Sequence, residues 1–242
     1  MKKLSIIVII LNLFLNEVNA QYANSDIIYN AYINNNMPLW KKVCDEMQQN
    51  QTHSNEFILN LINLQYGYIA YCIKNGKNEI ALTYLKIAED NLNLIEKKKY
   101  KLSLVSSYKS IFMSFRAGIN KKEALNYSIK SLNLAEKAIK QDSTNYFAFM
   151  QRANIYRYTP KTFNGSRDKA IEYYLKAEAL IKKEIGINKK NWNYLHLLVT
   201  ITETYIEQKN FKSAKIYCEK ILKIEPNYYL IKNIIYPKIE IK

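Results

Sequence analysis

The sequence predicts an all-α fold in which helix–turn–helix pairs stack into an α-solenoid. Between breaks, apolar residues recur at intervals of three and four, and no stretch sustains the alternation typical of a strand. The chain has only five glycines and four prolines, and nearly all of them lie at the breaks. A phrase that opens with alanine and places tyrosine three residues later occurs four times, which indicates a repeat architecture.

The first residues, 1–20, are expected to be a secretory signal peptide. Two lysines precede an apolar run at 4–15, and the small residues Val18 and Ala20 stand where signal peptidase cuts. Twelve apolar residues reach about 18 Å as a helix, less than the ~30 Å core of a membrane. We therefore expect no transmembrane segment after cleavage. The rest, 21–242, is expected to be one exported domain, soluble in the periplasm or outside the cell.

The apolar period and the breaks define the helices in chain order. Gly76, Gly118, Gly165 and Gly186 mark turns, because glycine adopts positive φ at no steric cost. Pro38 is placed to open a helix in its first turn, where the missing N–H is not needed. The expected helices span 25–34, 38–49, 55–74, 78–97, 101–117, 121–141, 145–158, 168–185, 190–208, 211–224 and 227–236.

Residues at the expected helix ends support these boundaries. Asn145 and Asn191 are placed as N-caps, and Ser54 precedes an acidic residue in another start signal. Pro237 is expected to follow the last helix. Gly67 is the one glycine inside a helical pattern, and its missing side chain is expected to let two helices approach closely.

The repeated segment gives a physical reason for the repeat architecture. The four alanines are 43, 46 and 44 residues apart, and each is expected to begin the second helix of a pair. The residues seven positions later share the same helix face and are small in three of four cases. This slim stripe lets the first helix of the pair pack closely, while the tyrosine ring is expected to fill the gap to the next pair. The alanines and their partners are Ala81 and Ala88, Ala124 and Ser131, Ala170 and Ala177, and Ala214 and Ile221.

The charge and the cysteines exclude several classes of function. The net charge of +15 comes from 36 basic and 21 acidic residues. Because lysines alternate with glutamates along the helices, we interpret them as solvated faces, with weak contact to anionic surfaces possible in an exported protein and no nucleic acid partner. Cys44, Cys72 and Cys218 form no metal-binding or disulfide pattern, and we expect buried free thiols. A Cys44–Cys72 bridge is the alternative.

No catalytic constellation is present in the sequence. It lacks the nucleophile-elbow and zinc-protease motifs and any glycine-rich phosphate loop. His53 and His196 are far apart, and His53 lies in a polar turn where we expect solvent exposure. We therefore expect no enzyme activity, no cofactor and no metal site.

The last unit resembles the tetratricopeptide repeat (TPR) of exported bacterial proteins. It departs from the family at Thr202, where Gly, Ala or Ser is favoured, and at Ile221, where Ala is favoured. Ala153 and Tyr156 match a first helix in another unit. The period of about 44 exceeds the usual 34, and 157–170 contains an inserted loop. The matching residues of the last unit are Leu198, Ile201, Tyr205, Phe211, Ala214, Cys218 and Pro226.

This resemblance implies about five TPR-like pairs plus a C-terminal capping helix. The region 55–226 carries the clearer repeats, 25–50 is a degenerate first unit, and 227–242 is the capping helix and tail. Long-period helical pairs of another solenoid family are the structural alternative.

The resemblance also implies a binding role, because the first helices of TPR pairs line a concave face that holds a peptide or helix. Our main hypothesis is therefore an exported adaptor without catalysis. The alternatives are a small-ligand-binding component of envelope transport, with a pocket near 159–166, and a binder of anionic glycan or lipid. Asn154 and Arg157 are neighbours on a helix and suit a carboxylate. The predicted partner-binding residues are Tyr68, Tyr71, Arg116, Asn154, Arg157, Tyr158, His196 and Glu203.

Overall fold

The computed structural model describes residues 25–50, 54–185 and 190–240, and every regular element within these ranges is helical. The predicted signal peptide, His53 and Gly186 lie outside the described residues. After a first helix at 25–33, the α-helices are α2 (Met37–Gln49), α3 (Asn55–Lys74), α4 (Asn78–Lys97), α5 (Leu102–Ile119), α6 (Ala124–Gln141), α7 (Tyr146–Tyr158), α8 (Arg167–Ile185), α9 (Trp192–Glu207), α10 (Phe211–Ile224) and α11 (Tyr236–Glu240). Short helical turns are η1 (Lys121–Glu123), η2 (Lys161–Phe163) and η3 (Leu230–Ile235).

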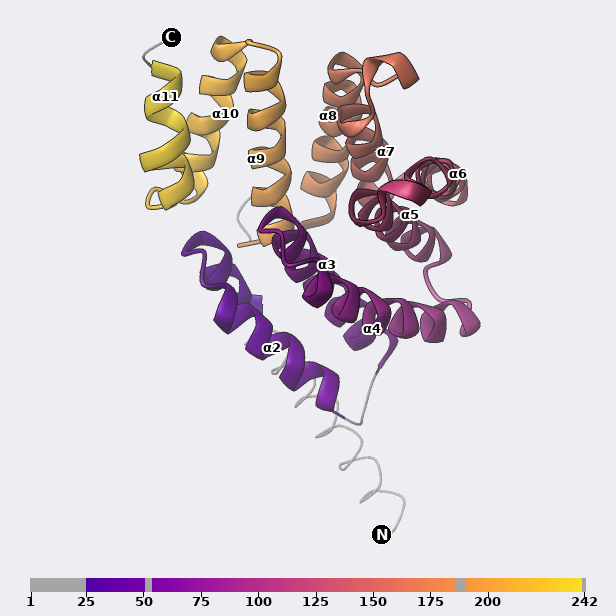
Figure 1. Cartoon of the computed structure of the whole chain (residues 1–242). Helices are drawn as coiled ribbons and strands as arrows, with labels where there is room; N and C mark the ends of the chain where they lie inside the picture. Colours follow the sequence, from indigo (N-terminus) through magenta and orange to yellow (C-terminus); the bar gives the residue numbers. More distant parts are fainter. Residues whose placement is uncertain (1–24, 51–53, 186–189, 241–242) are drawn as a thin grey trace.

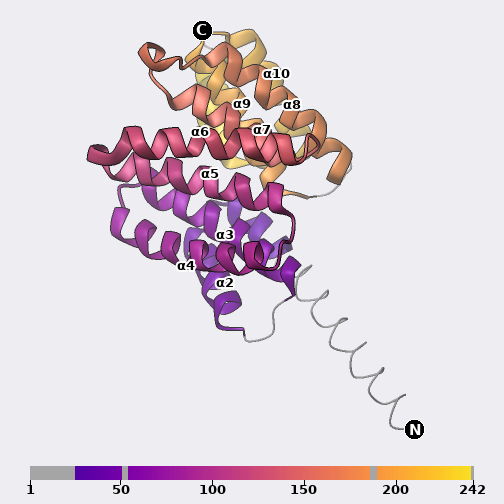
Figure 2. The same ribbon diagram turned by 90° about the vertical axis from the view of Figure 1, so that its right-hand side faces the viewer.

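The helices form pairs that follow one another along a curved path (Figure 1). α3 packs on α4, α5 on α6, α7 on α8 and α9 on α10, and each pair also contacts the next. The predicted all-α solenoid of helix–turn–helix pairs is therefore confirmed. Turned by 90°, the molecule shows α5 and α6 crossing its whole width (Figure 2). No helix in the described part of the chain is long and apolar enough to cross a membrane.

The predicted helix starts are held by the predicted caps. The Ser54 hydroxyl accepts a hydrogen bond from the Phe57 N–H at 3.1 Å. Asn145 caps α7 through the N–H groups of Phe147 and Ala148, and Asn191 caps α9 through Tyr194. Each cap satisfies a backbone donor that has no partner within its own helix.

Small residues of the repeat are buried on the second helix of each pair, as the sequence predicted, but the repeat tyrosines pack differently from the prediction. Ala81, Ala170 and Ala214 are buried, and so is every residue seven positions after a repeat alanine. The Tyr84 ring packs on Tyr68 in the first helix of its own pair, with ring centroids 4.7 Å apart, while its hydroxyl donates to Asp45 of the preceding unit. Tyr173 and Tyr217 likewise pack on rings of the first helix of their own pair, Phe149 and Tyr205. For these three tyrosines the expectation that the ring fills the gap to the next pair is therefore wrong.

The α5–α6 pair is held by small residues. Ser110 donates to the backbone oxygen of Ser131 at 2.8 Å, and Ser103 donates to that of Ala138 at 2.8 Å. These hydroxyls reach the backbone of the neighbouring helix because both helices have small side chains at the contact. The buried residues of α6 are Ser131, Ala135 and Ala138.

The C-terminal segment differs from the single helix predicted at 227–236. The π-helical turn η3 leads directly into α11, so Pro237 lies in the first turn of α11, where proline is tolerated, and not after the last helix. Tyr228 and Ile231 are buried, so the segment covers the end of the stack as a cap.

Gly67 and the cysteines complete the core. A Cβ atom at Gly67 would lie 2.6 Å from Cζ2 of Trp40 and 3.1 Å from Cη2 of Trp192. The missing side chain therefore makes room for two indole rings, where the sequence predicted a close approach of helices. Cys44, Cys72 and Cys218 are free and buried, as expected, without a Cys44–Cys72 bridge.

Candidate functional site

The two ends of the solenoid meet. The Tyr29 hydroxyl donates to Glu225 at 3.2 Å, and the Tyr32 hydroxyl lies 3.3 Å from Nδ1 of His196. Large rings fill the space between these ends, among them Trp40 and Trp192, whose centroids are 4.8 Å apart. We call this contact the junction; its residues are Tyr29, Tyr32, Trp40, Gly67, Trp192, His196, Glu225 and Tyr228. The junction joins the two ends of the curved row of helices, so that the inner sides of α3, α5, α7 and α9 face one another; we call these sides the inner face.

Tyr66 of α3 lies at the centre of this face. Its ring stacks on Phe115 of α5 at 6.0 Å and meets Phe147 of α7 edge-on at 5.4 Å. It also lies 6.4 Å from the His196 ring of α9. Burial raises the pKa of the Tyr66 phenol, so the hydroxyl stays neutral. Four helices thus contribute rings to the inner face. We call these rings, from Tyr66, Phe115, Phe147 and His196, the aromatic floor.

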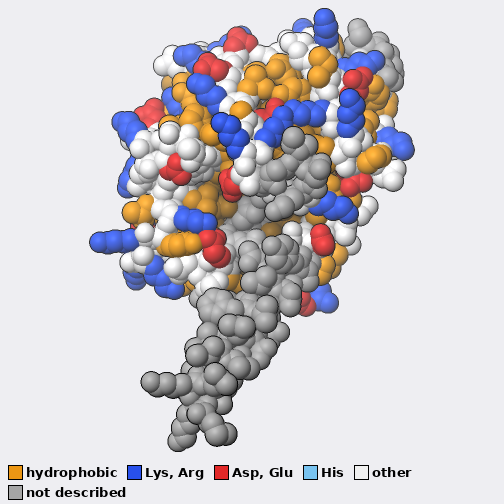
Figure 3. Space-filling view, turned by 180° about the vertical axis from the view of Figure 1, so that it is seen from behind, with side chains coloured by type: hydrophobic (Ala, Val, Ile, Leu, Met, Phe, Trp, Pro, Cys, Tyr) orange, Lys and Arg blue, Asp and Glu red, His pale blue; other side chains and the backbone are white. Residues whose placement is uncertain are grey.

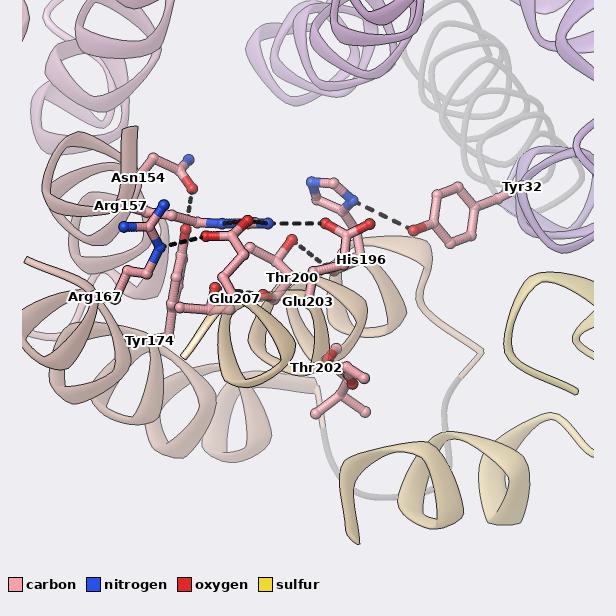
Figure 4. A network of polar contacts seen from close by, with 12 residues as sticks. Tyr32, Asn154, Arg157, Arg167, Tyr174, His196, Thr200, Thr202, Glu203 and Glu207 are labelled. Atoms are coloured by element: carbon pink, nitrogen blue, oxygen red, sulfur yellow. Dashed lines mark hydrogen bonds and ion pairs between the residues drawn. The ribbon is translucent and has the colours of Figure 1, made fainter. Parts of the chain in front are cut away.

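An ion-pair network borders this floor on α7 and α9 (Figure 4). Arg157, only 6% exposed, donates to Glu203 at 3.1 Å and to Glu207 at 2.7 Å. Arg167 adds a second cation to Glu207 at 2.9 Å. Burial alone would lower the pKa of the Arg157 guanidinium, but the bond to Glu207 together with the nearby charges of Tyr158, Tyr174 and Glu203 outweighs burial and raises that pKa. The carboxylates that Arg157 holds are thus the chain's own.

Asn154 is also engaged within the chain. It accepts a hydrogen bond from the Tyr174 hydroxyl at 2.6 Å and donates to Gln151 at 2.9 Å. Among the described residues, Nε2 of Gln151 and Nη1 of Arg157 are buried donors without a partner. An acceptor reaches them only if a side chain moves, because both atoms are enclosed.

Tyr158 is an exposed residue beside this network, whereas His196 is only partly exposed. Tyr158 is 70% exposed, and the Arg157 guanidinium lies 5.0 Å from its ring centroid. The Tyr158 phenol is close enough to Tyr66 to contribute to the raised pKa of that tyrosine. Burial lowers the pKa of His196 to about 4, so its imidazole is neutral near pH 7. Its Nδ1 already faces the Tyr32 hydroxyl, which leaves Nε2 as the second polar atom of the ring.

The structure brings five of the eight predicted site residues together and separates the other three. Asn154, Arg157, His196 and Glu203 lie on the inner sides of α7 and α9 (Figure 4). Tyr158 joins them at the end of α7, beside the Arg157 guanidinium.

The other three predicted residues make different contacts. Tyr68 is buried against α4, and Tyr71 lies beside Lys77, whose ammonium is 5.5 Å from its ring centroid. Arg116 donates to Glu89 through Nε at 2.9 Å and ties α5 to α4.

Sequence reasoning missed the aromatic floor and the junction. Neither Tyr66 nor Phe115 is among the predicted site residues. One signal was present: the chain has two tryptophans, and the one glycine inside a helical pattern lies between them in sequence. A helix glycine without a turn to explain it points to a bulky neighbour.

Two of the cavities lined by described residues bear on the small-ligand hypothesis. One, about 440 Å³, lies along α6 and is lined by Asn133, Glu136, Lys137, Lys140 and Gln141. The other, about 110 Å³, lies beside the junction among residues that include Asn63 and Trp192. Neither lies at the 159–166 loop where the small-ligand hypothesis placed a pocket. The described residues contain no group of three or more His, Cys, Asp or Glu side chains arranged to hold a metal ion.

Comparisons with known proteins support the fold. No family model matches the chain. A thermophilic TPR protein of Thermus thermophilus superposes with a TM-score of 0.58 at 14% identity, covering 93% of this chain and 100% of that one. The HusA haemophore from Porphyromonas gingivalis superposes with a TM-score of 0.58 at 16% identity, over 76% of this chain and 94% of HusA. The chain therefore has a TPR-like fold, as its last unit suggested.

A sequence similarity to one further protein covers only part of each chain. Trigger factor of Buchnera aphidicola is 34% identical over 110 residues, which make up 46% of this chain. The match spans only 24% of trigger factor, so it assigns no family.

Proposed function

We propose that this chain is an exported, non-catalytic adaptor that binds a segment of a partner protein on the inner face formed by α3, α7 and α9. The observation that carries the proposal is Tyr158. A tyrosine that is 70% exposed at the edge of an aromatic floor, beside a buried arginine, has a ring available for a partner. TPR-like folds are scaffolds of this kind.

The chemistry of the inner face favours a partner with an apolar or aromatic anchor and exposed backbone. Tyr158 and the half-buried Phe115 offer apolar contact, while His196 and Glu203 offer hydrogen-bonding groups on α9. Arg157 is already neutralised by Glu203 and Glu207. The inner face is therefore not suited to a strongly charged ligand. We expect the contact between Tyr158 and an uncharged side chain of the partner to contribute most to binding.

The test is site-specific photo-crosslinking in the cell of origin. A photoreactive amino acid replaces Tyr158 on the inner face, and the same amino acid replaces Tyr229 in a matched control. Tyr229 is 62% exposed in the C-terminal cap, so both sites are accessible. We expect a discrete protein adduct at position 158 and none at 229. Equal labelling at both sites, or none at 158, would refute the inner-face adaptor.

Export is tested separately from binding. The pattern of a positive start, an apolar run and small residues at 18 and 20 supports cleavage before Gln21. N-terminal sequencing of the protein from its own cell should begin at residue 21. A chain that retains Met1 and fractionates with cytoplasmic proteins would contradict export but leave the adaptor proposal intact.

A planar aromatic ligand is the second candidate. It is supported by the fold shared with a haemophore and by the exposed ring of Tyr158, which lies near the buried Tyr66 and its neighbour, the neutral His196. Haem is the probe. A saturable Soret shift that Tyr158→Ala weakens at least tenfold would favour this reading, whereas a shift equal to that of an unrelated helical protein would dismiss it.

The anionic-surface hypothesis has weaker support. On the face seen in Figure 3, lysine and arginine side chains are spread among carboxylates and apolar groups, without forming one patch.

A further inference from the structure

The outer face of α6 leaves two large aliphatic side chains in water. Leu125 is 67% exposed and Ile129 is 52% exposed, and they lie one turn apart on the helix. Both point away from α5, because the residues that α6 buries are Ser131, Ala135 and Ala138 on its other side. α6 crosses the near side of the molecule in Figure 2, with no helix in front of it. The side of α6 that carries Leu125 and Ile129 is therefore not covered by another helix of the described chain.

The same face continues as a polar crevice. Leu125, Ile129, Asn133, Glu136 and Lys140 follow one another at spacings of four, four, three and four, so they form one row along the helix. The cavity of about 440 Å³ is lined by this second half of the row. The outer face therefore combines an apolar half with a hollow polar half.

The charge of this face is positive and largely uncompensated. Lys122, Lys130, Lys137 and Lys140 are exposed, and none of them forms an ion pair with a described residue. Glu136, the acidic residue of the row, is paired with Arg152 of α7 at 3.4 Å and not with these lysines. Acidic groups on a partner therefore find free lysines beside the apolar pair.

We propose that the outer face of α6 is a docking surface for an acidic amphipathic helix of another protein. A helix laid along α6 would place apolar side chains on Leu125 and Ile129 and its carboxylates against the lysines, which complement them in charge. A second copy of this chain is disfavoured as the occupant, because a two-fold contact through this face would bring the same lysines together. The surface lies on α6, whereas the proposed adaptor site lies on α3, α7 and α9.

The test measures binding of a designed helical peptide to the full chain by fluorescence anisotropy. The probe carries leucines on one face and glutamates on the other. We expect saturable binding that weakens as salt rises, because free carboxylates and lysines are screened. A peptide with the same leucines and lysines in place of glutamates should bind at least tenfold more weakly.

Two variants of the chain locate the contact. The double variant Leu125→Asn/Ile129→Asn should weaken binding of the acidic peptide at least tenfold, and Lys137→Glu/Lys140→Glu should do the same. Ile216→Asn is the matched control, because Ile216 is likewise exposed on an outer helix, α10; it should leave binding unchanged.

Three outcomes would overturn the proposal. They are equal binding of the acidic and basic peptides, equal loss in the Ile216→Asn control, and dimerisation of the wild-type chain that Leu125→Asn/Ile129→Asn abolishes. Circular dichroism confirms that each variant is folded. Because Tyr158→Ala should not affect this peptide, failure here and failure of the inner-face adaptor are distinguishable.

Discussion

The α5–α6 pair and the junction hold helices together by opposite means. Between α5 and α6 the contact is made by serines and alanines, and hydroxyls such as that of Ser110 bond directly to the backbone of the partner helix. At the junction the contact is made by large rings, with Trp40 and Trp192 packed over the space that Gly67 leaves free. One contact depends on small side chains and the other on large ones.

The difference follows from sequence distance. α5 and α6 are joined by a four-residue connection, 120–123, so little chain entropy opposes their pairing and close backbones suffice. The junction joins residues more than 150 positions apart, such as Tyr32 and His196, and closing a longer loop costs more entropy. Aromatic rings bury the largest apolar area per residue, which offsets that cost. Contacts within a repeat and contacts between chain ends therefore need different residues.

The largest effect is expected from adding bulk to the small-residue contact. Ser131→Leu places a branched side chain where Ser110 and Ser114 lie within 3.1 Å and 2.8 Å of the serine hydroxyl. Overpacking of this kind should lower the free energy of unfolding by about 3 kcal/mol in urea titrations. Ser128→Leu, on the exposed side of the same helix, should change it by less than about 0.5 kcal/mol. Equal stability of the two variants would mean that α5 and α6 are not closely packed.

A smaller effect is expected at the junction from a single methyl group. Gly67→Ala puts a Cβ atom 2.6 Å from a Trp40 ring carbon, and the cost of displacing the rings, about 1–3 kcal/mol, should exceed the ~1 kcal/mol gained in helix propensity. Gly118 lies in the last turn of α5 and not in the turn that the sequence predicted, and a Cβ atom there meets no atom within 4 Å. Gly118→Ala should therefore stabilise the chain by about 0.5–1 kcal/mol. Opposite signs in thermal or urea unfolding support the ring-filled junction, and stabilisation by both variants contradicts it.

The junction should also respond to pH, whereas the serine contact should not. His196 keeps a pKa of about 4 when folded, against 6.5 ordinarily, so below pH 6.5 the unfolded chain binds the extra proton. Stability should then fall as pH decreases from 6.5 toward 4, by about 1 kcal/mol per pH unit. Carboxyl groups such as Glu178, whose pKa is lowered because bonds from two lysines and a tyrosine outweigh burial, add a loss only below about 4.5.

The control for the pH prediction is His196→Asn, which retains polar atoms but does not titrate. Urea titrations at pH 6.5, 6.0, 5.5 and 5.0 should show a slope for wild type that is absent in this variant. An unchanged slope would assign the pH dependence to groups elsewhere in the chain.

The site was predictable only in part, for a physical reason. Asn154, Arg157 and Tyr158 share one helix, so their proximity follows from helical spacing, and His196 and Glu203 are correctly placed on the neighbouring inner helix. That Arg157 already holds Glu203 and Glu207 could not be read from sequence, because it depends on the distance and rotation between α7 and α9. The arrangement of helices decides which polar groups remain available.

The sequence by itself determined the helices, their caps, their pairing and the small stripe at each second helix. These features depend on residues within one repeat, where a 3.6-residue period and a short turn leave few alternatives. Only the tertiary structure decided that the chain ends meet, that aromatic rings fill the inner face, and that Leu125 and Ile129 remain outside. These features depend on the curvature accumulated over all pairs, which is the sum of many small packing angles that no single stretch of sequence encodes.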